Sequence, residues 1–413
     1  MREIIGNVIV GQSGGPTSVI NSSLVGVYKT AVDRGANKVF GMRYGIQGFL
    51  QENVIDLSEH IKSELDIELL KRTPSSFLGS CRYKLPEPVY GNEVFEKIFE
   101  ILNKLEIKHF FYIGGNDSMD TIAKLSKYTE FNGSKIHFVG IPKTIDNDLA
   151  ITDHTPGFGS AAKYIAAVTK EVIRDSLVYD TDSVTVIEVM GRNAGWLTGA
   201  SALAKADDSI GPDLIYMPEA IFDTEKFMEH VKEIKKTRKA VVIIVSEGIK
   251  LADGRYVCEI DSPVSSVDMF GHKQLVGCSR VLAQMIEREL GGKSRAIELS
   301  TLQRCAAHMT SRVDITEAFQ VGGAAVKASA EGKSGIVITL KRVSDEPYIC
   351  VTEAHDVNLI ANFEKKVPRE WINEAGNYVT EEFLNYVRPL IQAELTPVMV
   401  EGIPRHLDLK LDK

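Results

Sequence analysis

The chain has few cysteines, and their arrangement excludes two common uses of this residue. The five cysteines among 413 residues are scattered and include no Cys-x-x-Cys pair. An odd, dispersed set argues against a disulfide framework and against a zinc site, and it is typical of reduced thiols in a cytoplasmic protein. The nine histidines are dispersed as well and show no metal-ligand spacing. We therefore expect a cytoplasmic location and no structural zinc.

Further absences narrow the class of partner. No apolar run approaches the length of about 18 residues that a membrane-spanning helix needs, and the first residues resemble a strand and not a secretory signal. The formal net charge is −8, from 48 basic and 56 acidic residues, so no overall positive field favours nucleic acid or an anionic membrane. We expect neither partner, and an anionic substrate would have to be held by local arginines and lysines.

The common nucleotide-binding motifs are also absent. No Gly-x-Gly-x-x-Gly follows the first expected strand. Gly292–Ser294 and Gly332–Ser334 resemble the end of a Walker A motif, but the required upstream glycine is Glu287 in one case and Lys327 in the other. The sequence therefore excludes a dinucleotide fingerprint and a P-loop.

What the sequence does contain is a repeated α/β pattern. With 44% hydrophobic and 25% charged residues, the chain can bury a sizeable core, and its length predicts two domains or lobes. Short apolar runs alternate with amphipathic helical segments, which predicts parallel sheets covered on both faces by helices. The expected strands are Ile5–Gly11, Lys38–Met42, His109–Ile113, Ile136–Ile141, Ser183–Val189, Leu214–Met217, Ala240–Ser246, Arg295–Leu299 and Gly335–Leu340.

Several expected strands end in loops rich in glycine or charge. Gly14 and Gly15 follow the first strand, Asn116 and Asp117 follow the third, and Gly191 follows the fifth. Closely spaced glycines let backbone N–H groups approach an anion, and the N-terminus of the next helix adds a favourable dipole. One such turn is a weak signal, because tight βα turns use glycine for geometry alone. Several of them at matching strand ends indicate a ligand-binding edge of the sheet.

Residues 142–148 carry the densest charge pattern at such a strand end. Asp146 and Asp148 lie two residues apart, and Lys143 lies three residues before the first of them. One carboxylate can accept a proton, its neighbour can hold a metal ion, and the ammonium group can neutralise phosphate charge, as phosphoryl transfer requires. The alternative is a solvated acidic turn, because Asp and Asn are common turn residues.

Six segments then stand in the order found in one family. The chain resembles the 6-phosphofructokinase family over roughly its first 330 residues. The segments that carry the resemblance are Gly14–Gly15, Phe77–Arg82, Ile113–Ser118, Pro142–Asp148, Glu188–Arg192 and Ser246–Gly248. The resemblance implies two similar Rossmann-like lobes with mostly parallel sheets, an active site in the cleft between them, and a homodimer or homotetramer. It also implies Mg²⁺-assisted phosphorylation of the C1 hydroxyl of fructose 6-phosphate, giving fructose 1,6-bisphosphate, a reaction of glycolysis.

Two positions bear on the phosphoryl donor. Asp117 and Lys143 stand where ATP-using members of the family have glycine. A carboxylate at 117 would fill and charge the space that the α-phosphate of a nucleotide needs, and an ammonium group at 143 would stabilise the dense charge of diphosphate. Both changes match the diphosphate-dependent branch of the family, whose reaction releases orthophosphate and is typically reversible. The alternative is that both side chains face solvent and ATP still binds.

By this resemblance, Asp146 accepts the proton of the C1 hydroxyl, and Lys143 and Asp117 complete the catalytic set. The residues expected at diphosphate are Gly14, Gly15, Arg82 and Lys143, and those expected at Mg²⁺ are Asn116, Asp117 and Asp148. The residues expected at the sugar phosphate are Thr144, Ile145, Asp146, Met190, Gly191, Arg192, Glu247, Arg295, Thr301 and Arg304.

The chain departs from the family pattern at several positions. Asn116 stands where the family commonly has a metal-binding Asp, and Asp117 can take over that task. Ser183 stands where many bacterial relatives present an arginine to the sugar phosphate of a neighbouring subunit, and Thr301 replaces a histidine or tyrosine. The candidates that remain for the 6-phosphate are Arg304, Arg295, Lys273 and Arg312.

The chain is expected to divide into a phosphoryl-donor lobe over residues 1–150, a sugar-phosphate lobe over 151–340, from which part of the chain returns to the first lobe, and a C-terminal extension over 341–413. The extension has no counterpart in the short bacterial members and carries an expected helix over Glu381–Glu394.

Three competing functions stay open: an ATP-dependent 6-phosphofructokinase, an NAD or lipid kinase with a similar glycine loop, and a catalytically silent regulatory subunit. Glu247 argues against the second, and the intact charge cluster argues against the third.

Overall fold

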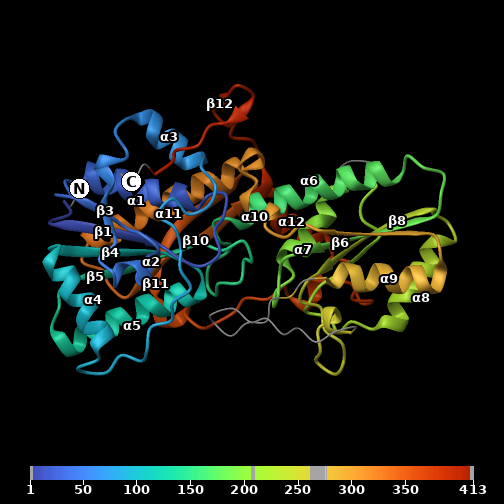
Figure 1. The fold of residues 1–413 in the computed structure, drawn as a ribbon, viewed down its shortest axis with the longest axis horizontal. Coiled ribbons are helices and arrows are strands. Elements are labelled where there is room, and N and C mark those ends of the chain that lie inside the picture. Colours follow the sequence, from blue (N-terminus) through green and yellow to red (C-terminus); the bar gives the residue numbers. More distant parts are fainter. Residues whose placement is uncertain (1–2, 206–209, 261–274, 276, 410–413) are drawn as a thin grey trace.

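A computed structural model describes residues 3–205, 210–260, 275 and 277–409. Two α/β lobes lie side by side along the long axis of the molecule, and several segments cross between them (Figure 1). The predicted fold class is therefore confirmed. Within the described residues, no helix combines the length and apolar character that crossing a bilayer requires.

The first lobe is built on a seven-stranded sheet with the order β11-β10-β5-β4-β1-β2-β3. The five central strands are parallel, while β3 and β11 run antiparallel at the two edges. Its strands are β1 (Asn7–Gln12), β2 (Val39–Met42), β3 (Val54–Asp56), β4 (Ile107–Gly114), β5 (His137–Pro142), β10 (Ile336–Asp345) and β11 (Tyr348–Asp356). The carboxyl ends of β1, β4 and β5 therefore meet at one edge, which faces the second lobe.

Helices cover both faces of this sheet, because side chains along each parallel strand alternate between two apolar cores. Val8 and Val10 face one core and Ile9 faces the other. The helices α1 (Ile20–Asp33), α3 (Glu64–Arg72) and α11 (Arg312–Ala330) pack on the first of these cores. The helices α2 (Gly45–Phe49), α4 (Glu93–Lys104) and α5 (Asn116–Asn132) pack on the second. A β-carbon on Gly26 would lie 2.2 Å from the carbonyl oxygen of Phe319, so glycine permits the close contact between α1 and α11.

The second lobe has a four-stranded parallel sheet with the order β7-β8-β6-β9. Its strands are β6 (Ser183–Val189), β7 (Leu214–Tyr216), β8 (Ala240–Ser246) and β9 (Lys293–Glu298). Its helices are α6 (Phe158–Ser176), α7 (Trp196–Ala200), α8 (Thr224–Lys235) and α9 (Cys278–Leu290). Two apolar cores flank the sheet here as well. The short helix α10 (Leu302–Cys305) follows β9 and leads back toward the first lobe (Figure 1).

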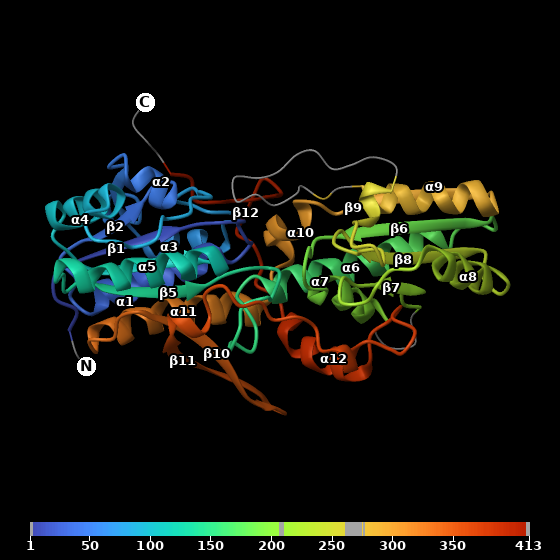
Figure 2. The ribbon, with the colours of Figure 1, turned by 90° about the horizontal axis from the view of Figure 1, so that it is seen from below.

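The chain after β11 touches both lobes. Helix α12 (Glu381–Val387) packs on the second lobe (Figure 2). There the rings of Phe383 and Trp196 stack with their centroids 6.0 Å apart. A small hairpin of β12 (Met399–Val400) and β13 (Ile403–Pro404) follows, and Leu407 then packs against a core of the first lobe. The expected helix over Glu381–Glu394 is shorter than predicted: Pro389 has no backbone N–H to donate to the carbonyl oxygen four residues earlier, and the chain continues as a 3₁₀ turn over Arg388–Ile391.

Each of the nine expected strands is present, with ends that differ by a few residues. The edge strands β3 and β11 were not predicted. Strand β10 runs to Asp345 and pairs with β11, so the chain passes the expected boundary at residue 340 inside a strand of the first lobe. The division of the chain at residues 150 and 340 stays a prediction.

Candidate active site

A cleft of about 690 Å³ lies between the lobes. It is lined by the loops after β1, β4 and β5 of the first lobe and by the loops after β6 and β8 of the second. Most of the residues that the sequence singled out are therefore brought together, because parallel strands place these loops at one edge of each sheet. The volume is in the range of small-molecule sites.

Lys143 lies at the floor of the cleft, directly after β5. Its side chain is 2% exposed, and its Nζ donates to the carbonyl oxygen of Gly15 at 2.7 Å. Burial lowers its pKa to about 8, against the opposing effect of the negative charges on Asp146 and Asp148. A β-carbon on Gly14 would lie 3.2 Å from the same Nζ. The ammonium group therefore sits next to the glycine loop, where an anion can reach both.

Asp146 and Asp148 stand on either side of Asn147, which has a left-handed backbone with φ of 55°. This turn lets both carboxylates line the cleft while Asn147 itself is fully buried. Burial raises the pKa of Asp146, and burial together with the charge of Asp146 raises the pKa of Asp148 to about 7. The hydroxyl of Thr144 accepts from the backbone N–H of Asp146 at 3.1 Å. A carboxylate with a raised pKa is a stronger base than one in water.

The loop after β4 brings the N-terminus of α5 to the cleft. Asn116 and Asp117, the first residues of α5, both line it. The side-chain amide of Asn116 is engaged at both atoms by the backbone of the C-terminal segment: Nδ2 donates to the carbonyl oxygen of Phe363 at 2.7 Å, and Oδ1 accepts from the N–H of Asn362. An aspartate could not donate to Phe363, so this contact gives a physical reason for the amide at 116.

Two guanidinium groups from distant parts of the sequence lie in the cleft near the glycine loop. Arg82 and Arg304 both line the cleft, and burial together with the charge of Arg82 lowers the pKa of Arg304. A β-carbon on Gly15 would lie 3.2 Å from Nη1 of Arg304. Two like charges held close together favour an anion between them.

The second lobe contributes Met190, Arg192 and Glu247 to the cleft. Gly191 lies behind them with φ of 140°, and its N–H donates to Oε1 of Glu247 at 3.4 Å. Burial raises the pKa of Glu247 to about 7, and the charge of Asp146 across the cleft adds to the rise. The carboxylate is thus placed to accept hydrogen bonds from the hydroxyl groups of a ligand.

Three of the residues expected at the 6-phosphate do not line this cleft. Arg312, the first residue of α11, is exposed. Arg295 is on β9, where Nη1 pairs with Asp175 at 3.4 Å, and Thr301 is exposed before α10. Their roles at the sugar phosphate stay a prediction. Lys273 lies outside the described residues. Conversely, Asn362, Phe363 and Glu364 line the cleft and were not predicted, because no motif or composition signal marks this part of the tail.

The fold and the cleft define a class: a two-lobed α/β protein whose glycine loops, buried cation and paired carboxylates suit phosphoryl transfer. The family model described as Phosphofructokinase matches residues 7–329. The chain belongs to the phosphofructokinase family, as the sequence motifs predicted.

The similarity extends over almost the whole chain. It is 40% identical over 403 residues to the pyrophosphate–fructose 6-phosphate 1-phosphotransferase of Halomonas elongata, covering 97% of this chain and 95% of that protein. It is 41% identical over 408 residues to the protein of the same name from Methylococcus capsulatus, covering 98% and 96%. The crystal structure of the pyrophosphate-dependent phosphofructokinase from Marinobacter aquaeolei has a TM-score of 0.87 and 36% identity, covering 99% and 98%. These relatives therefore share the segment after residue 340.

Proposed function

We propose that this protein transfers a phosphoryl group from diphosphate to the C1 hydroxyl of fructose 6-phosphate, reversibly, giving fructose 1,6-bisphosphate and orthophosphate. The observation that carries the donor assignment is the buried ammonium group of Lys143 beside the loop of Gly14 and Gly15, with Asp117 at the neighbouring helix N-terminus. The names of the relatives from Halomonas elongata and Methylococcus capsulatus support the same reaction.

In this reaction the C1 oxygen attacks the distal phosphorus of diphosphate, the bridging P–O bond breaks, and orthophosphate leaves. Asp146 takes the proton of the C1 hydroxyl, and the raised pKa of its carboxyl group supports that task. Lys143 and Arg82 neutralise the charge of the phosphoryl groups. Positioning and charge neutralisation supply most of the acceleration in transfers of this kind.

The donor end discriminates by charge and space. A nucleotide would bring its α-phosphate toward the carboxylate of Asp117, a like-charge contact, whereas diphosphate ends before that point. Lys143 offsets the dense negative charge of diphosphate, which has no nucleoside to add binding energy. The glycines found in ATP-using members at these two positions would provide neither effect.

The oxygen-rich donor set also fits Mg²⁺. Carboxylate and amide oxygens are the ligands that this ion prefers, and it usually keeps part of its water shell. Asp148 and Asp117 are the residues that would hold it, with the oxygen of Asn116 as a weaker candidate because it already accepts from Asn362. When bound, the ion would neutralise diphosphate charge.

The sugar phosphate would lie between the second lobe and the loop after β5, residues 143–156, which we name the catalytic loop. Met190, Gly191, Arg192 and Glu247 would contact the sugar, Thr144 and Ile145 its reacting end, and Arg304 its 6-phosphate. Arg295 and Thr301 remain candidates by resemblance alone. Assembly into a homodimer or homotetramer and a cytoplasmic location belong to the same proposal.

A coupled assay tests the donor assignment. Purified protein with Mg²⁺ and fructose 6-phosphate is offered diphosphate or ATP in separate reactions. We expect kcat/KM with diphosphate to exceed that with ATP by at least about 100-fold, as two unfavourable contacts predict. Equal turnover with both donors would indicate the ATP-dependent alternative. Sugar-phosphate binding without turnover on either donor would indicate the catalytically silent subunit.

A further inference from the structure

Residues 357–391 form a segment that passes between the lobes after β11, and we name it the C-terminal strap. Its backbone meets the catalytic loop directly: Leu149 and Glu364 form an antiparallel bridge, and the N–H of Lys365 donates to the carbonyl oxygen of Asp148 at 2.7 Å. The carbonyl oxygen of Lys365 accepts from Nε1 of Trp196 in the second lobe at 3.0 Å. The strap is therefore bonded to both walls of the cleft.

Asn147 is the point at which the strap can influence chemistry. This residue separates Asp146 from Asp148, and its left-handed backbone is uncommon for a residue with a side chain. Such a conformation persists only where the surroundings hold it in place. If Asn147 relaxed, both neighbouring carboxylates would turn away from their present positions in the cleft.

Two side chains of the strap hold Asn147. The hydroxyl of Tyr386 accepts from Nδ2 of Asn147 at 2.9 Å and donates to the carbonyl oxygen of Asp153 at 2.6 Å. The Nζ of Lys365 donates to Oδ1 of Asn147 at 3.4 Å and to the carbonyl oxygens of Thr152 and Asp153 at 3.1 and 2.6 Å. The backbone N–H of Thr155 also donates to Oδ1 of Asn147, at 3.1 Å.

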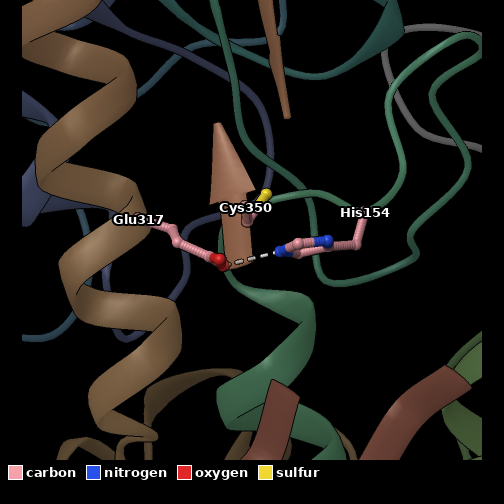
Figure 3. Close-up of side chains that lie close together, drawn as sticks. All are labelled: His154, Glu317 and Cys350. Atoms are coloured by element: carbon pink, nitrogen blue, oxygen red, sulfur yellow. Dashed lines mark hydrogen bonds and ion pairs between the residues drawn. The ribbon is translucent and has the colours of Figure 1, made fainter. Parts of the chain in front are cut away.

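The far end of the catalytic loop is fixed by a charged cluster. The ring of His154 is 1% exposed and lies between two carboxylates, with Nδ1 at 2.7 Å from Asp153. Its Nε2 lies 2.6 Å from Glu317 of α11 (Figure 3). Cys350 lies next to this pair. The three side chains resemble a metal site in composition, but both ring nitrogens are already engaged by carboxylates at hydrogen-bond distance. The cluster is thus a clamp between the loop and α11, and the strap adds separate contacts at Asn147, Thr152 and Asp153.

We propose that Lys365 and Tyr386 are positioning residues: they hold the Asn147 turn and thereby direct Asp146 and Asp148 into the cleft. The inference rests on the proposed function, in which these two carboxylates serve as base and metal ligand. It gives the segment after residue 340 a role in the reaction, although neither side chain lines the cleft.

Tyr386→Phe is the sharpest test, because it removes one hydroxyl group and keeps the ring that packs on Trp196 at 5.2 Å. Misplaced reacting groups typically cost up to about 100-fold in rate. We therefore expect kcat to fall by about tenfold, with the KM values for fructose 6-phosphate and diphosphate within about twofold of the parent. Tyr378→Phe is the matched control, since the hydroxyl of Tyr378 lies beside Gly211 in the second lobe, and it should leave kcat unchanged.

Amide hydrogen exchange of a peptide spanning residues 143–156 gives a second readout that needs no substrate. We expect Tyr386→Phe and Lys365→Met to speed exchange in this peptide, while Tyr378→Phe does not. Lys365→Met removes three hydrogen bonds and should have the larger effect on both exchange and kcat. Thermal unfolding of each variant shows whether the protein remains folded at the assay temperature.

The outcomes separate this inference from the donor assignment. If the parent enzyme used ATP, the proposed donor would be wrong, and the same variants would be compared with ATP, because Asp146 serves either donor. An unchanged kcat in a folded Tyr386→Phe protein would overturn the positioning role, whether or not exchange increased. A loss of kcat that Tyr378→Phe matched would overturn it too, by showing a general packing effect.

Discussion

The residues proposed to bind diphosphate all line the cleft, whereas only some of those proposed for the 6-phosphate do. At the donor end, Lys143 is buried and hydrogen-bonded to Gly15, and Arg82, Asp117 and the α5 N-terminus surround the same space. Among the residues expected to hold the 6-phosphate, Arg304 lines the cleft with its guanidinium group beside Gly15, whereas Arg295 pairs with Asp175 and Thr301 is exposed.

The difference shows which binding groups the fold of one chain brings together and which it does not. The donor end draws on loops after three neighbouring strands of one sheet, so the fold itself brings its groups together. The sugar-phosphate end draws on the second lobe and on the segment after β9, so its groups come from separate parts of the fold. We expect substitutions at the donor end to change kcat, and substitutions at the other end to change KM.

Asp146→Asn should have the largest effect. Removing a general base typically costs about 10²–10⁴-fold in rate, and the carboxylate of Asp146 faces the cleft. We expect kcat to fall by that factor while the KM for fructose 6-phosphate stays within about threefold. The exposed Asp253→Asn serves as a matched control. Comparable turnover in Asp146→Asn would remove this residue as the base.

Arg304→Met tests the expected contact between Arg304 and the 6-phosphate. Losing a charge-assisted contact to a phosphate costs about 1.5–3 kcal/mol, or roughly 10–100-fold in affinity. We expect the KM for fructose 6-phosphate to rise by this factor with little change in kcat. Arg295→Met should change it much less if each chain binds the sugar phosphate alone. If the KM for fructose 6-phosphate rose equally in both variants, the expected difference between Arg304 and Arg295 would be wrong. Arg295 would then have to bind sugar phosphate in the cleft of a second copy of the chain.

Asn116→Asp sharpens the account of the donor end. The new carboxylate would face the carbonyl oxygen of Phe363 in place of a donor group. The loss should cost about 1–3 kcal/mol of stability, measured by urea unfolding, and Asn116→Ser offers a smaller polar side chain for comparison. Unchanged stability together with tighter Mg²⁺ binding would show that position 116 serves the metal and not the strap.

A pH-dependent effect on stability is expected from the clamp of His154. The charges of Glu317 and Asp153 raise the pKa of His154 to about 9 despite its burial. Because the folded pKa lies above the ordinary value of 6.5, the stabilisation is complete below pH 6.5 and is lost as pH rises through 9. The change should be on the order of 1–3 kcal/mol, measured as the melting temperature against pH. His154→Gln should lack this dependence; if it kept the full dependence, another group would be responsible.

The features that could be predicted from the sequence are those that short, local patterns encode. Alternating strands and helices, the loops after β1, β4 and β5, and the contrast of Lys143 and Asp117 with the family glycines follow from short segments. The strap could not be predicted, because Lys365 and Tyr386 act on Asn147 across more than 200 residues of sequence. Nothing in a tail of mixed composition indicates which of its side chains will meet a catalytic loop.

The edge strand β11 was missed for a related reason. Its residues are half-buried or exposed and none is fully buried, so no apolar run extends along its whole length, and it pairs with β10 as an antiparallel hairpin at the edge of the sheet. Likewise, the ion pair of Arg295 with Asp175 joins residues from different elements. Arginine in a family motif predicts a phosphate contact, but only the fold decides which partner that side chain reaches.

The comparison of kcat/KM for diphosphate and ATP in the parent and in a variant with Asp117→Gly and Lys143→Gly tests the central claim most directly. The account predicts that the parent strongly prefers diphosphate, and that the double variant loses about 100-fold or more with diphosphate while gaining measurable turnover with ATP. If the ratio of the two donors were the same in the parent and in the folded double variant, the claim that these two side chains select diphosphate would be contradicted.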